Sequence, residues 1–107
     1  MKCIVDESDI RNQNGNYIIY CYTVWMPKTL SGMMMRMLEK VELETSIPVL
    51  GCDVDVFVST KQLHEVTRVP TLVFMSDGKV LKKIEGQPLI SAYRPAVRDA
   101  FKIRSDI

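Results

Sequence analysis

The stretch VPTLVFMSDGKVLKKIEG, residues 69–86, decides how the second half of this chain folds. Pro70 opens an apolar run rich in β-branched and aromatic residues, and Asp77-Gly78 interrupts it as a tight-turn signal. A second run follows directly over residues 80–85. Two such runs around a short Asp-Gly turn predict an antiparallel β hairpin.

The residues before this hairpin add further strands. Residues 17–24 and 47–54 are apolar on both faces, which is typical of strands buried inside a parallel sheet. Residues 3–5 predict a short additional strand, and the polar residues 6–14 leave room for about one helical turn.

Three later segments have helical character. The longest begins near residue 30, with Thr29 or Ser31 as its N-cap. Its expected core stripe consists of Met33, Met34, Met37, Leu38 and Val41. A short helix is expected over residues 61–66, and a last helix is expected to hold Pro95 in its first turn. The order of elements predicts an α/β fold with a mixed sheet of four to five strands flanked by helices, ending in the hairpin and a helix.

Length and composition narrow the class of protein. A chain of 107 residues is expected to form one domain over residues 1–107. The net charge of +1 gives no argument for binding nucleic acid or an acidic membrane. The N-terminal residues resemble no signal peptide, and no run approaches the roughly 20 apolar residues of a membrane span, so a cytoplasmic location is expected.

The cysteines and the histidine do not form a recognisable site. Cys3, Cys21 and Cys52 are widely spaced and form no C-x-x-C pair. We expect Cys21 and Cys52 to be small buried groups on neighbouring strands and His64 to be a solvated helix residue. With one histidine and scattered thiols, neither a metal site nor a cofactor is expected.

Several motifs together resemble the thioredoxin family. Asp-Val-Asp at 53–55, Val-Pro-Thr at 69–71, Asp-Gly at 77–78 and Gly86 fall at the spacing that a thioredoxin shows. The resemblance covers residues 17–101. It implies the thioredoxin fold, with a cis peptide bond before the proline of the Val-Pro-Thr motif.

The resemblance is lost at the redox residues. Trp25 stands where the family has its active-site tryptophan, so Met26 and Thr29 occupy the positions of the two reactive cysteines. Neither a thioether nor a hydroxyl can supply the thiolate that disulfide exchange requires. The family's buried aspartate and its lysine partner likewise fall at Tyr20 and Gly51.

We therefore predict a divergent, redox-inactive member that acts as a protein-interaction module or accessory subunit. The expected partner is a protein or an extended peptide, and the chain is expected as a monomer or as a subunit of a larger assembly. The contact surface, called here the tryptophan surface, is expected to consist of Trp25, Met26, Pro27, Lys28, Thr29, Val69, Pro70 and Thr71. The alternative is a divergent thiol-disulfide oxidoreductase that uses Cys3, Cys21 or Cys52. A third hypothesis is an adaptor like the phosducin-like or splicing-type thioredoxin-fold proteins.

Overall fold

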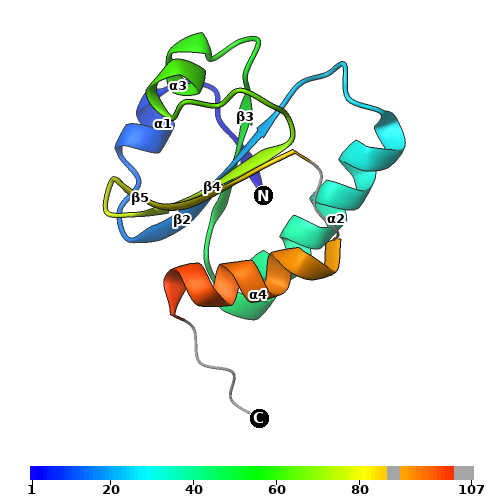
Figure 1. The fold of residues 1–107 in the computed structure, drawn as a ribbon. Helices are drawn as coiled ribbons and strands as arrows, with labels where there is room; N and C mark the ends of the chain where they lie inside the picture. The colour runs from blue at the N-terminus through cyan, green and yellow to red at the C-terminus, as the bar shows by residue number, and fades with distance from the viewer. Residues whose placement is uncertain (87–89, 103–107) are drawn as a thin grey trace.

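The structure, a computed structural model, describes residues 1–86 and 90–102 and contains one five-stranded sheet (Figure 1). The strands are β1 (Lys2–Cys3), β2 (Asn16–Tyr22), β3 (Val49–Asp53), β4 (Thr71–Ser76) and β5 (Lys79–Glu85). They lie in the order β1-β3-β2-β4-β5. Strands β1, β2 and β3 run parallel, whereas β4 is antiparallel to β2 and β5 is antiparallel to β4. The predicted mixed sheet and its hairpin are confirmed.

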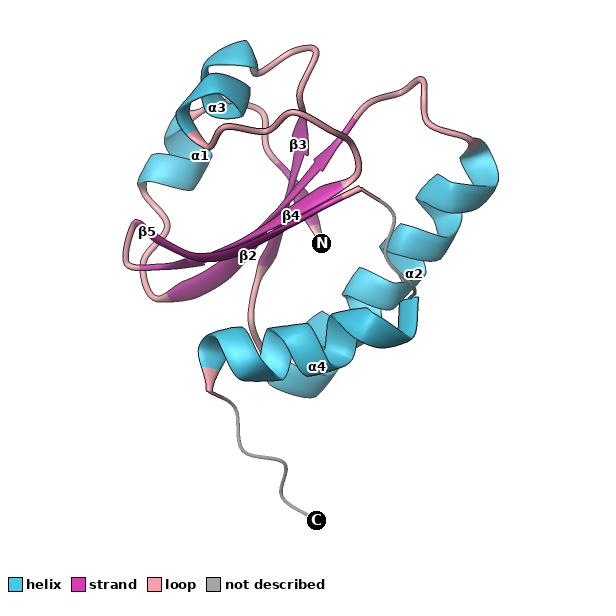
Figure 2. Cartoon of the chain, viewed as in Figure 1, coloured by secondary structure: helices cyan, strands magenta, loops and turns pink. Residues whose placement is uncertain are grey.

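Helices cover both faces of this sheet. They are α1 (Ser8–Arg11), α2 (Lys28–Thr45), α3 (Val58–Leu63) and α4 (Ile90–Phe101). Figure 2 shows α2 and α4 on one face of the sheet and α1 and α3 on the other. None of the helices in the described residues is both long and apolar enough to span a membrane.

Each face of the sheet has its own apolar core, because successive side chains of a strand point to opposite faces. The core beneath α2 and α4 includes Ile18, Tyr20, Met34, Met37, Leu38, Val41, Phe74, Tyr93 and Val97. The core beneath α1 and α3 includes Ile4, Ile10, Tyr17, Ile19, Cys21, Cys52, Val66 and Val73. The predicted methionine stripe is confirmed at Met34 and Met37, whereas Met33 is only half-buried.

Some helix boundaries differ from those predicted. Helix α2 begins at Lys28, so neither Thr29 nor Ser31 is its N-cap; the preceding Pro27 makes no side-chain capping bond. Pro27 is the N-cap, and its carbonyl accepts a hydrogen bond from the Ser31 N–H at 3.0 Å, so the helical hydrogen bonding begins there. Helix α3 likewise begins at Val58, three residues before the predicted start.

Pro95 lies inside α4 rather than in its first turn. Proline in a helix interior removes one backbone hydrogen bond and costs about 3 kcal/mol. Tyr93 and Val97, on either side of it, are each only 1% exposed. Because burying large apolar side chains contributes roughly 1.5–3 kcal/mol each, their packing offsets the cost of the proline.

Tyr20 in β2 and Gly51 in β3 form a large-and-small pair in the interior of the sheet. Tyr20 pairs with Gly51 in the sheet register, and the rings of Tyr20 and Tyr22 stack with centroids 5.3 Å apart. A Cβ atom added at Gly51 would lie 3.5 Å from Cε1 of Tyr22 and 3.4 Å from Sγ of Cys3. The space beside Gly51 is therefore bordered by the Tyr22 ring and the Cys3 thiol. Burial raises the pKa of Tyr20 to about 12.

Candidate functional site

The tryptophan surface begins in the loop between β2 and α2. The Met26 N–H donates to the Thr23 carbonyl at 3.3 Å, and the Trp25 N–H donates to Thr23 Oγ1 at 3.4 Å. Thr23 Oγ1 in turn donates to Asp55 Oδ2 at 2.5 Å, in the segment after β3. The loop that presents Trp25 is therefore held from inside by Thr23 and tied to the next loop by Asp55.

The residues of this loop differ sharply in exposure. The side chain of Trp25 is 84% exposed, whereas Met26 is 8% exposed. Pro27, Lys28 and Thr29 are exposed at the start of α2. The thioether is covered and the indole projects into solvent, so the loop offers an apolar contact and no thiol.

The second segment of the tryptophan surface lies just before β4. The Val69–Pro70 peptide bond is cis. The Pro70 carbonyl accepts a hydrogen bond from the Gly86 N–H at 3.0 Å, and Thr71 Oγ1 donates to the Arg68 carbonyl at 2.6 Å. Pro70 and Thr71 are buried and Val69 is half-buried.

The sheet register brings the two segments to the same edge. Cys21, near the end of β2, pairs with Thr71 at the start of β4. The loop after β2 and the loop before β4 are therefore neighbours. Of the predicted contact residues, those exposed to solvent are Trp25, Pro27, Lys28 and Thr29.

The sequence-based reasoning missed further exposed apolar side chains in the same region. Val5, Val24, Val56 and Val58 are 85%, 71%, 66% and 48% exposed. They follow β1, β2 and β3, whose carboxyl ends share one edge of the sheet because these strands are parallel. Val5 and Val24 are the last residues of the predicted strands 3–5 and 17–24, whereas β1 and β2 end two residues earlier, so an apolar residue at the very end of a predicted strand is the signal that could have found them.

The cysteines lie in two different environments. Cys21 and Cys52 are register partners in β2 and β3, both fully buried, while Cys3 is exposed, and all three are free thiols. The expected burial of Cys21 and Cys52 is confirmed. A hydrogen bond between the two thiols and their burial raise the pKa of Cys21, and the same hydrogen bond lowers the pKa of Cys52.

The sequence profile of the Thioredoxin family matches residues 6–93. This chain belongs to the thioredoxin family. Among solved structures, mitochondrial thioredoxin 3 from Saccharomyces cerevisiae, in its oxidized form, is 27% identical, with a TM-score of 0.79 over 92% of this chain and 94% of that chain. A mutant thioredoxin from Halobacterium salinarum has a TM-score of 0.81 at 20% identity, over 97% of this chain and 93% of that chain, and supports the fold alone. No curated protein sequence matches significantly.

The loop after β2 contains no cysteine. In this thioredoxin-family chain, the sequence from Trp25 to Thr29 reads WMPKT, without a cysteine. Within the described residues, no group of three His, Cys, Asp or Glu side chains lies close enough to hold a metal ion.

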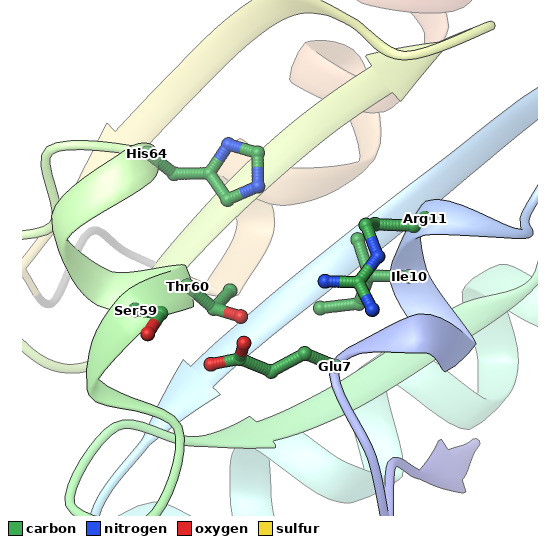
Figure 3. Close-up of a pocket in the computed structure, with 6 residues that line it drawn as sticks. All are labelled: Glu7, Ile10, Arg11, Ser59, Thr60 and His64. Atoms are coloured by element: carbon green, nitrogen blue, oxygen red, sulfur yellow. The ribbon is translucent and has the colours of Figure 1, made fainter.

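A pocket of about 240 Å³ lies on the other face, between α1 and α3 (Figure 3). It is lined by Glu7, Ile10, Arg11, Ser59, Thr60 and His64. Burial and the nearby Lys83 lower the pKa of His64. His64 is half-buried and closes α3, so the expectation of a solvated helix residue is wrong. His64 lines this pocket together with residues of α1, an arrangement that the local sequence around His64 does not reveal.

Proposed function

We propose that this member of the thioredoxin family does not exchange thiols for disulfides at the family's redox position. We propose further that it binds a protein or an extended peptide through the tryptophan surface, as an interaction module or accessory subunit. The observation that carries this proposal is the contrast within one loop. Trp25 is 84% exposed, while Met26, at the position of the nucleophilic cysteine, is 8% exposed.

The chemistry of the loop supports the absence of exchange. Disulfide exchange begins with attack by an accessible thiolate. Met26 offers a covered thioether and Thr29 a hydroxyl, and neither forms a nucleophilic anion near neutral pH. The remaining thiols of the sheet interior, Cys21 and Cys52, are fully buried.

The geometry of the loop supports binding. Tryptophan is among the residue types most enriched at the energetic centres of protein interfaces. The backbone N–H of Trp25 is hydrogen-bonded within a short loop, so the backbone that presents the indole is already ordered before a partner binds. Exposed Val24 and Val56 stand at the same edge of the sheet and enlarge the apolar area that a partner would cover.

Two observations favour a second function. Cys3 is exposed, and the hydrogen bond from Cys21 lowers the pKa of Cys52. A divergent oxidoreductase would use one of these thiols. Two facts argue against an oxidoreductase. Cys52 has no exposed surface. Cys3 has no neighbouring cysteine in the sequence that could resolve a mixed disulfide.

The binding proposal is tested by purifying the tagged chain from its native host and identifying bound proteins by mass spectrometry. The same purification is made with Trp25→Ala and with Leu43→Ala, a matched control because Leu43 is also 84% exposed but lies on α2. Truncating a central interface tryptophan costs at least about 2 kcal/mol, or roughly thirtyfold in affinity. We expect Trp25→Ala to lose a partner that Leu43→Ala keeps. Identical partners for all three chains would refute the proposed surface.

The redox part is tested separately by the reduction of insulin with dithiothreitol. We expect the native chain to give no acceleration beyond dithiothreitol alone. Acceleration that disappears in Cys3→Ser or Cys52→Ser would establish the oxidoreductase instead.

A further inference from the structure

The pocket between α1 and α3 is lined by one positive and one negative side chain. Helix α1 is a single turn, so it covers only part of its face of the sheet and leaves the pocket beside α3. Figure 3 shows Glu7 and Arg11 coming from α1 and its start, and Ser59, Thr60 and His64 coming from α3 and its end. Ile10, which is 6% exposed, adds an apolar wall.

Glu7 and Arg11 are four residues apart, a spacing at which a glutamate and an arginine on a helix usually pair. In the structure they do not pair, and among the described residues the salt bridges involve neither of them. In Figure 3 the Arg11 guanidinium points toward the space beside His64 and Thr60, and the Glu7 carboxylate lies near Ser59 and Thr60. The pocket thus presents one cation and one anion that are available to a ligand.

This combination selects the charge of a ligand. A simple anion would be attracted by Arg11 but repelled by Glu7. A simple cation would be attracted by Glu7 but repelled by Arg11. A molecule with both charges pairs with both residues at once. The two hydroxyls and the imidazole of His64, whose lowered pKa keeps it neutral near pH 7, add polar contacts without changing this balance.

We propose that this pocket binds a small zwitterion of the α-amino acid class, with its carboxylate on Arg11 and its ammonium group on Glu7. The pocket is smaller than the usual site for a drug-sized molecule, which fits a ligand of this size. The inference is independent of the tryptophan surface, because the lining residues belong to α1, α3 and their ends.

The test is a titration of the full chain, labelled with nitrogen-15, with glycine, L-alanine, L-serine, L-glutamate and L-lysine. Backbone amide shifts are followed by NMR, with acetate and methylammonium as probes that carry one charge each. We expect at least one amino acid to give saturable shifts confined to α1 and α3. Because a hydrogen bond to a charged group contributes about 1.5–3 kcal/mol, acetate and methylammonium are expected to bind at least about tenfold more weakly.

Two variants assign the contacts. Arg11→Gln and Glu7→Gln are each expected to weaken the amino acid by about tenfold or more. Arg36→Gln and Glu39→Gln, at exposed positions of α2 on the other side of the sheet, serve as matched controls and are expected to leave binding unchanged. The spectra themselves show whether each variant is folded.

Three outcomes would overturn the proposal. The first is no saturable shift with any of the five amino acids. The second is acetate binding as tightly as the best amino acid, which would make the pocket a site for carboxylates alone. The third is saturable binding that survives both Arg11→Gln and Glu7→Gln.

Discussion

The difference in burial among the three cysteines predicts very unequal reactivity of their thiols. The perturbation is Cys3→Ser, which removes the exposed thiol and leaves the two in the sheet interior. Cys21 and Cys52 are both 0% exposed and lie in β2 and β3, which are interior strands of the sheet. A reagent reaches them only when those strands open.

The expected magnitude follows from the cost of that opening. Core strands open with free energies close to that of global unfolding, for which about 5 kcal/mol is a low value. Each 1.4 kcal/mol is a factor of about ten, so the two buried thiols should react more than about a thousandfold slower than Cys3.

The assay is the reaction with dithionitrobenzoate at about pH 8, followed by absorbance. Peptide mapping by mass spectrometry assigns each thiol. The native chain should show one fast thiol and two slow ones, and Cys3→Ser should show only the slow ones. The chain unfolded in urea is the control, since all its thiols should react quickly. A fast thiol in folded Cys3→Ser would refute the reasoning and revive the oxidoreductase hypothesis.

The redox positions, the core and the histidine each give a further prediction. Met26→Cys/Thr29→Cys, which introduces two thiols at the positions that we propose for the family's redox cysteines, should accelerate insulin reduction by dithiothreitol, whereas Met26→Ser/Thr29→Ser should not. Equal rates for both variants would show that two thiols at these positions are not sufficient for exchange. Met34→Ala should lower the free energy of unfolding in urea by about 2–5 kcal/mol because Met34 is 1% exposed, whereas Met35→Ala, at a 41% exposed position, should change it by less than about 0.5 kcal/mol. Burial and a neighbouring lysine lower the pKa of His64 from 6.5, so the unfolded chain binds a proton at this residue more readily than the folded chain. The free energy of unfolding should therefore fall as the pH drops through 6.5. His64→Gln should weaken that dependence, measured by urea denaturation at a series of pH values.

The hairpin could be predicted from sequence because its turn is determined locally. Asp77 and Gly78 have φ angles of +48° and +81°, and an Asp-Gly pair adopts positive φ more readily than most others. The register shift between β4 and β5, where Phe74 and Met75 pair with Lys82 and Val80 and Leu81 is left over, could not be predicted, because it depends on how the two strands fit together across the sheet.

The candidate site could be predicted only in part. The motif spacing located the loop at Trp25, but the covering of Met26 depends on tertiary packing. The pocket beside His64 had no sequence pattern at all, because α1 and α3 are brought together only by the fold.

Strand β5 has a consequence for how copies of this chain meet. It forms one end of the sheet over seven residues, whereas β1 at the other end has only two. Lys79 and Lys82 on β5 are exposed. Two copies aligned along this strand would bring four ammonium groups together, and such lysines are a recognised protection against uncontrolled sheet extension. Repulsion between these lysines therefore opposes edge-to-edge pairing of two copies along β5.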